Sequence, residues 1–159
     1  MGKRWQHHGS TLRQEERLFD VEYVPSPWEP IADQVALYEA TGGAEGSDFM
    51  GGPCIILTTI GAKTGTLRKT PLIRVEEDGR YVVIGSMGGA PSHPNWVHNL
   101  RAQPRCRLQD GPVVHELTAR ELHGEDKQRW WELAATVWPD YDKYQASTER
   151  VIPLFLLEP

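Results

Sequence analysis

The chain lacks the features that would place it in a membrane or in an oxidising compartment. Its 159 residues include only two cysteines, Cys54 and Cys106. Each lies in a predicted strand, where a small buried side chain is commoner than a disulfide. No apolar run approaches the roughly 18 residues of a membrane helix, and the first residues lack a signal-peptide core. We therefore expect a cytoplasmic protein without an integral membrane segment, and leave peripheral contact with the cytoplasmic membrane face open.

The sequence also lacks the spacing of several common catalytic motifs. Its six histidines show no metal-ligand spacing with cysteines or carboxylates, so no metal site is predicted. Residues 61–66 resemble a phosphate-binding loop in composition, but the Gly-x4-Gly-Lys-Ser/Thr spacing fails. Residues 85–89 match neither a dinucleotide-binding fingerprint nor a nucleophile elbow. A metalloenzyme and a serine hydrolase are therefore disfavoured.

Basic residues are concentrated in the middle of an acidic chain. The formal net charge is -5. Between residues 49 and 109, eight basic residues stand against three acidic ones, a net of +5, which leaves -10 for the flanks. This distribution favours a local anion-binding site over cations scattered on exposed strands. A nucleic-acid partner is not predicted, because no aromatic residues interleave with a basic strand face.

Apolar and alternating segments predict an antiparallel β-protein with a few helices. Turn signals at 77–79 and 110–111 join neighbouring strands into hairpins. The pattern is typical of a small α+β barrel. The six predicted strands span residues 54–60, 67–75, 80–86, 105–109, 113–122 and 151–157.

Helical spacing predicts a first helix that begins with Ser26 as its N-cap and ends at Gly42. Pro27 would occupy its first position, and its buried face would include Trp28, Val35 and Tyr38. Further helices are expected at residues 94–102 and 125–138, and residues 140–148 form a tyrosine-bearing segment. We interpret residues 1–25 as a tail or short surface helix and residues 26–159 as one domain.

The order of motifs in residues 57–107 is more specific than any of them alone. A Thr-Thr-x-Gly-x-Lys-Thr-Gly-x-x-Arg-x-x-Pro-Leu run precedes a strand that ends in Gly-Ser-x-Gly-Gly. A Pro-x-Trp-x-x-Asn-Leu-x-Ala-x-Pro segment follows, and residues 138–153 add Trp-Pro-Asp-Tyr-Asp-Lys-Tyr-Gln with Arg150, Ile152 and Pro153. Together these motifs resemble the deazaflavin-dependent nitroreductase family across about residues 28–159.

The resemblance implies a split β-barrel that binds coenzyme F-420, a deazaflavin with a phosphate and an oligoglutamate tail. Lysine and arginine side chains suit such an anionic tail, and glycines permit close approach of the backbone. A helix that starts at Pro94-Asn95-Trp96 would direct its free amides at an anion. The implied cofactor-binding residues are Lys63, Thr64, Arg68, Lys69, Pro71, Ser86, Met87, Gly88, Gly89, Asn95, Trp96 and Asn99.

The same resemblance implies catalysis by Ser86, Tyr141 and Tyr144. A hydroxyl near the acceptor would stabilise or protonate it as hydride arrives, and Tyr141 is the first choice for this donor. Ordinary packing is the alternative for both tyrosines. The expected activity is an F-420H2-dependent reductase acting on an electron-poor acceptor such as a quinone, an enone or a nitroaromatic.

Some residues depart from the family pattern. Ala62 and Met87 stand where many relatives carry a basic residue, which weakens the anion site, and Trp138 and Ile73 replace aromatic residues of a nitroimidazole-reducing relative. An FMN-dependent split-barrel oxidoreductase and a non-catalytic deazaflavin carrier therefore remain alternatives. Both a monomer and a homodimer fit the sequence.

Overall fold

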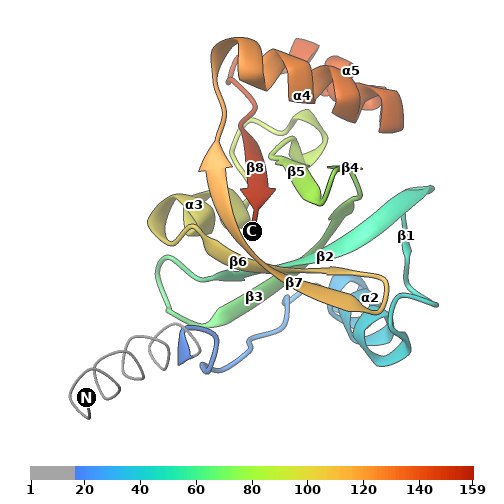
Figure 1. The fold of residues 1–159 in the computed structure, drawn as a ribbon, viewed down its shortest axis with the longest axis vertical. Coiled ribbons are helices and arrows are strands. Elements are labelled where there is room, and N and C mark those ends of the chain that lie inside the picture. The colour runs from blue at the N-terminus through green and yellow to red at the C-terminus, as the bar shows by residue number, and fades with distance from the viewer. Residues whose placement is uncertain (1–16) are drawn as a thin grey trace, which may run out of the picture.

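The computed structural model of the protein describes residues 17–159 (Figure 1). The strands are β1 (Asp48–Phe49), β2 (Gly52–Ile60), β3 (Leu67–Ile73), β4 (Glu76–Glu77), β5 (Arg80–Ile84), β6 (Arg105–Asp110), β7 (Val113–Glu121) and β8 (Leu154–Glu158). The helices are α2 (Glu29–Thr41), the short 3-10 helix η1 (Met87–Gly89), α3 (Asn95–Ala102), α4 (Gly124–Val137) and α5 (Asp140–Ala146).

The strands form one curled antiparallel sheet. Their order is β1-β2-β6-β7-β8-β5-β4, and β3 pairs separately with β2. Figure 1 shows α4 and α5 at one end of this sheet and α2 at the other. The predicted α+β split barrel with about six strands is therefore confirmed, and two short two-residue strands, β1 and β4, are added to it.

The strand β2 is buried along nearly its whole length because its two faces meet different cores. Ile55 and Leu57 belong to the cluster inside the curled sheet, whereas Cys54 and Ile56 pack with Val35 and Tyr38 of α2. A strand covered on both faces reads as a continuous apolar run instead of an alternating one. This double burial explains the unbroken hydrophobic pattern at residues 54–57.

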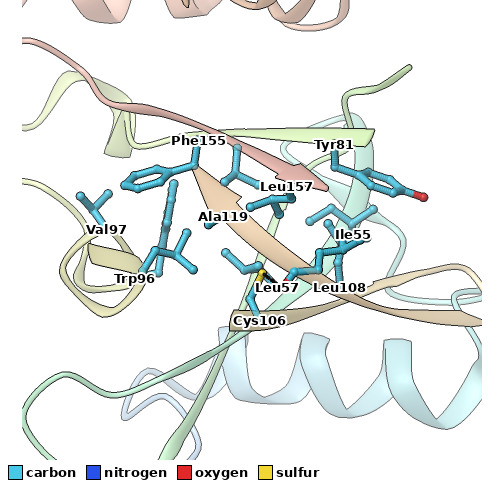
Figure 2. Packing of buried hydrophobic residues seen from close by; sticks show 13 residues of the cluster. Ile55, Leu57, Tyr81, Trp96, Val97, Cys106, Leu108, Ala119, Phe155 and Leu157 are labelled. Carbon is cyan, nitrogen blue, oxygen red and sulfur yellow. Dashed lines mark hydrogen bonds between the residues drawn. The ribbon is translucent and has the colours of Figure 1, made fainter. Parts of the chain in front are cut away.

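The cluster inside the sheet reaches the helix α3. Figure 2 shows Trp96 and Val97 of α3 beside Phe155 of β8, with Tyr81 at the other end of the cluster. The ring centroids of Trp96 and Phe155 lie 6.0 Å apart in an edge-to-face arrangement. The adjacent β8 residues Leu154 and Leu156 face a third cluster under α4 and α5. The sheet therefore holds α3 on one side and α4 and α5 on the other.

The predicted start of the first helix is wrong. The helix begins at Glu29 with Trp28 as its N-cap, and the Ser26 Oγ accepts a hydrogen bond from the Trp28 N–H at 3.2 Å. A start at Ser26 would have placed Pro30 where the helix needs a backbone N–H, whereas a start at Glu29 puts Pro30 in the first turn. Trp28 consequently lies outside the helix and is 65% exposed instead of buried.

The segment that precedes α2 contacts the sheet. Tyr23 forms an isolated parallel bridge with Leu67, and the Leu67 N–H donates to the Glu22 carbonyl at 2.8 Å. Most of the expected tail, residues 1–16, lies outside the described residues, so the domain boundary after residue 25 stays a prediction. Within residues 17–159, no helix combines the length and the apolar character that crossing a membrane requires.

Candidate cofactor and acceptor site

Three adjoining cavities follow the same side of the barrel. The apolar cavity, about 440 Å³, lies between β3, η1 and α5, and the basic cavity, about 570 Å³, lies at the loop between β2 and β3. The middle cavity, about 350 Å³, connects them. It shares Thr70, Met87, Pro94 and Trp96 with the apolar cavity and Arg68, Asn95 and Asn99 with the basic cavity.

Thirteen of the fourteen sequence-predicted site residues line this trough, and Gly89 does not. The apolar cavity contains Pro71, Ser86, Met87, Gly88, Trp96, Tyr141 and Tyr144. The basic and middle cavities contain Lys63, Thr64, Arg68, Lys69, Asn95 and Asn99. The fold thus brings residues from the sequence between 63 and 144 to one surface.

The loop 61–66 forms one wall of the basic cavity and is closed by its own hydrogen bonds. The Gly61 N–H donates to the Thr66 carbonyl at 2.7 Å, and the Gly65 N–H donates to the Gly61 carbonyl at 2.8 Å. A Cβ on Gly61 would lie 2.6 Å from the Thr64 Oγ1, so this tight loop requires glycine there. The loop presents Lys63 and Thr64 to the cavity.

Asn99 ties this loop to α3 and β2. Its side chain is 6% exposed; its Oδ1 accepts from the Ala62 N–H at 2.9 Å, and its Nδ2 donates to the Thr59 Oγ1 at 3.0 Å. Asn99 was predicted as a cofactor-binding residue. These two bonds let Asn99 support the loop, and each end of its amide keeps one further hydrogen-bonding position, so its role toward the cofactor stays a prediction.

The cations of the site differ in whether they are already paired. Lys69 forms an ion pair with Glu39 and lies over the Tyr23 ring, 4.7 Å from its centroid. Among the described residues, neither Lys63 nor Arg68 has an acidic partner within ion-pair distance. Lys63 and Arg68 therefore offer free positive charge to a ligand, whereas Lys69 has an intramolecular counter-ion.

The turn after β5 carries three consecutive residues with positive φ. Met87, Gly88 and Gly89 have φ values of 45°, 64° and 83°. A Cβ on Gly88 would meet nothing within 4 Å, whereas one on Gly89 would collide with the Ser147 Oγ and lie 3.1 Å from the Tyr144 carbonyl oxygen. Gly88 therefore leaves open space at the cavity, and Gly89 serves the packing of the turn against α5.

Tyr141 lines the apolar cavity with a hydroxyl that is not itself fully buried. The residue is 5% exposed, and no group within residues 17–159 forms a hydrogen bond with its hydroxyl. Burial, followed by the nearby Tyr144, raises the pKa of Tyr141, so the hydroxyl keeps its proton at physiological pH. Tyr144 differs, since its hydroxyl accepts a hydrogen bond from the Trp138 Nε1 at 3.4 Å. The Tyr144 hydroxyl still has its own proton to donate, so the two tyrosines differ in burial, and Tyr141 is the more buried of them.

Ser86 and Trp96 complete the apolar cavity. Ser86 is buried, and its hydroxyl makes no hydrogen bond to another described residue. Trp96 is a core residue packed on Phe155 that also reaches the trough. A stacking role and a packing role are therefore compatible for this tryptophan.

Sequence reasoning missed the residue that holds the turn Ser86–Ala90 by hydrogen bonds. Arg150 donates to the carbonyls of Ser86 and Ala90 and to the His93 Nδ1, each at 2.7 Å. His98 also lines the basic cavity. Arg150 belonged to the C-terminal motif, but only its position in the fold assigns it these contacts.

Comparison with known proteins places the chain in a defined family. A family model for F-420H2-dependent quinone reductases matches residues 31–159. An F-420H2-dependent quinone reductase of Mycobacterium tuberculosis is 35% identical over 126 residues, which cover 77% of this chain and 85% of that protein.

Two solved structures are also similar. An F-420-H2-dependent reductase, FDR-A, is 48% identical with a TM-score of 0.64 and covers 67% of this chain and 94% of its own. A protein described as a domain-swapped dimer is 42% identical with a TM-score of 0.67, over 84% of this chain and 100% of its own. The chain therefore belongs to the F-420H2-dependent quinone reductase family.

Proposed function

We propose that the protein is a reductase that uses F-420H2 to reduce a quinone. The observation that carries this proposal is the continuous trough, which changes from free cations at Lys63 and Arg68 to an apolar end with the Tyr141 hydroxyl. A cofactor with an anionic tail and a planar redox-active ring requires this gradient. The family and its M. tuberculosis member support the same activity.

The residues of the trough fit the cofactor. Lys63 and Arg68 would bind the phosphate and carboxylates of the tail, and Arg68 borders both the basic and the middle cavity. The ring would lie toward Pro71, Gly88 and Trp96, where the lining is apolar and Gly88 leaves room. No feature of the site favours FMN over this cofactor.

The protein's own part in the reaction is to orient, to exclude water and to supply a proton. When bound, the reduced deazaflavin supplies a hydride, which carries two electrons to the acceptor. A quinone that gains a hydride needs one further proton to become a hydroquinone. The Tyr141 hydroxyl is placed to donate a hydrogen bond or that proton to the acceptor oxygen, with Ser86 as a second hydroxyl donor.

The acceptor end favours a flat apolar molecule. Trp138 and Ile73 line the apolar cavity, and Gly52 makes room for both, since a Cβ there would lie 2.9 Å from the Ile73 Cδ1 and 3.1 Å from the Trp138 Cζ3. We rank quinones first, and enones and nitroaromatics after them, because the matching family model is that of F-420H2-dependent quinone reductases. Peripheral contact with a membrane surface, which would suit a lipophilic quinone, stays a prediction, as do the cytoplasmic location and the choice between monomer and homodimer.

Titration and turnover together test the proposal. Oxidised F-420 should bind the purified protein in the micromolar range, and F-420H2 should be oxidised faster with a quinone than with an enone or a nitroaromatic. No binding at these concentrations would contradict the proposed cofactor. Binding without oxidation across the whole acceptor panel would instead identify a deazaflavin carrier. A yellow protein purified with bound flavin would favour FMN.

A further inference from the structure

Arg150 lies between α5 and β8, and its backbone is fixed on both sides. The Gln145 Nε2 donates to the Arg150 carbonyl at 2.8 Å, and the Gln145 Oε1 accepts from the Ile152 N–H at 2.9 Å. Just beyond the paired strands β5 and β8, the Gly85 N–H donates to the Pro153 carbonyl at 2.9 Å. The start point of the Arg150 side chain is therefore held relative to the end of β5.

The guanidinium of Arg150 spans the whole turn that carries Ser86 and Gly88. Its Nη2 donates to the Ser86 carbonyl, its Nε to the Ala90 carbonyl and its Nη1 to the His93 Nδ1, all at 2.7 Å. One rigid fork thus joins the first residue of the turn to the last. A lysine has no such fork and could not reach three acceptors in these directions.

The turn needs this external support. Three successive residues adopt positive φ, and one of them, Met87, is not glycine. Such a conformation is strained and persists only where the surroundings hold it. The turn's own backbone contributes two hydrogen bonds, from the Gly89 N–H to the Ser86 carbonyl and from the Ala90 N–H to the Met87 carbonyl.

Arg150 has no counter-ion among the described residues. No carboxylate of residues 17–159 lies within ion-pair distance of its guanidinium, and all its acceptors are neutral. Two of its donors are directed at the carbonyls of Ser86 and Ala90, and the third is directed at His93.

We infer that Arg150 is a positioning residue that holds the Ser86–Ala90 turn in the shape that presents the Ser86 hydroxyl and the open space at Gly88 to the cavity. This inference deepens the proposed function and rests on it for its catalytic consequence. Its structural consequence does not need the cofactor. The two consequences can therefore be tested separately.

The first test uses the cofactor-free protein and measures amide hydrogen exchange by NMR. In Arg150→Met, the Gly89 and Ala90 amides should lose their protection while the amides of β2 keep theirs. The matched control is Arg120→Met, which removes an exposed arginine paired with Glu158 on the sheet; the turn should stay protected. Unchanged protection at Gly89 and Ala90 in Arg150→Met would overturn the inference, whether or not the protein uses F-420.

The second test is a double-mutant cycle on the kcat for quinone reduction. Arg150→Met should lower kcat on the order of 10²-fold, as misplacement of a site group by about 1 Å does. Addition of Ser86→Ala should then cost little more, because both changes disable the same hydroxyl. Fully additive losses would show that Arg150 does not act through Ser86.

Arg150→Lys removes the forked guanidinium but keeps the positive charge. It is also the milder variant if Arg150→Met folds poorly. The positioning role predicts that Arg150→Lys has a kcat close to that of Arg150→Met and an equally exposed turn. Wild-type kcat and protection in Arg150→Lys would show that a cation alone is enough and would overturn the positioning role. Absence of F-420H2 oxidation by the wild-type protein would contradict the proposed function instead, and the exchange experiment would still decide the inference.

Discussion

The cations of the basic and middle cavities divide into free ones, Lys63 and Arg68, and a paired one, Lys69. Lys63→Ala or Arg68→Ala should each weaken F-420 binding about 10- to 100-fold, since a charge-assisted hydrogen bond contributes roughly 1.5–3 kcal/mol. The loss should be larger at low ionic strength, where the attraction is unscreened. Fluorescence titration of the cofactor at two salt concentrations measures both effects.

Lys69→Ala is the matched control for that experiment. Lys69 is paired with Glu39, so its removal should change the affinity less than removal of either free cation. Equal losses for all three variants would show that the Glu39 pair opens when the cofactor binds. Unchanged affinity in Lys63→Ala and Arg68→Ala would place the anionic tail elsewhere.

Tyr141 is the residue on which turnover should depend most. Tyr141→Phe keeps the ring that packs 6.3 Å from Tyr144 but removes the free hydroxyl. A proton donor of this kind typically contributes at least about 10²-fold to the rate. We therefore expect kcat to fall by that order with little change in cofactor affinity, as stopped-flow oxidation of F-420H2 would show. Full activity in Tyr141→Phe would remove its proposed role.

His93 makes the support of the turn sensitive to acid. Burial first, and then Arg150, Arg101 and His98, lower the pKa of His93, while Glu121 opposes them. The unfolded chain therefore binds a proton more readily, and stability should decline as the pH falls below about 6.5 toward the folded-state pKa. Protonation would also remove the acceptor that Arg150 uses.

The corresponding measurement is thermal unfolding of the wild type and of His93→Asn between pH 5 and pH 8. Asparagine keeps an acceptor oxygen near the Nδ1 position and does not titrate. The decline in unfolding temperature below about pH 6.5 should therefore be smaller in His93→Asn. Parallel curves for the two proteins would assign the acid sensitivity to other groups.

At the scale of elements, the turn Ser86–Ala90 places two adjacent glycines in different surroundings. Gly89→Ala should destabilise the protein more than Gly88→Ala, because its Cβ would collide with the Ser147 Oγ next to α5. Gly88→Ala meets no neighbour and costs only about 1–2 kcal/mol of left-handed strain. Chemical unfolding of the two variants gives the order of their free energies.

Cofactor binding should rank the two variants in the opposite order when the loss of F-420 affinity is divided by the loss of unfolding free energy. The Cβ of Gly88→Ala would enter the open space at the trough, so this variant should lose more F-420 affinity for each unit of stability lost. Equal ratios in the two variants would show that Gly88 has no contact with the ligand.

On the scale of the whole molecule, the curled sheet lies between three hydrophobic clusters, and the stability of the domain depends on their burial. Leu57→Ala removes a fully buried side chain from the cluster inside the sheet. Such a truncation costs about 2–5 kcal/mol, a large share of the stability of a domain this size. Urea denaturation should show this loss, whereas Val113→Ala at an exposed strand position should stay within about 0.5 kcal/mol of wild type.

The sequence by itself determined the six longer strands and three of the helices, and the family resemblance supplied the residues expected at the site. These features depend on near neighbours, since alternation, turn residues and motif spacing are local properties of the chain. The wrong start predicted for α2 also has a local cause. Pro30 has no backbone N–H and is tolerated only in the first turn, so the helix begins at Glu29 and not after Ser26. The order and spacing of the motifs indicated the cofactor through the family that they resemble.

Only the tertiary structure decided which of those residues are free to act. The pairing of Lys69 with Glu39, the tether of Asn99 to the loop at Ala62 and the contacts of Arg150 with the turn join residues 30 to 64 positions apart. Such contacts arise from the curl of the sheet, the packing of α2 and α3 against it and the position of the segment between α5 and β8. No local pattern encodes them, because the free energy of an ion pair or a hydrogen bond depends on distance in space and not on distance along the chain.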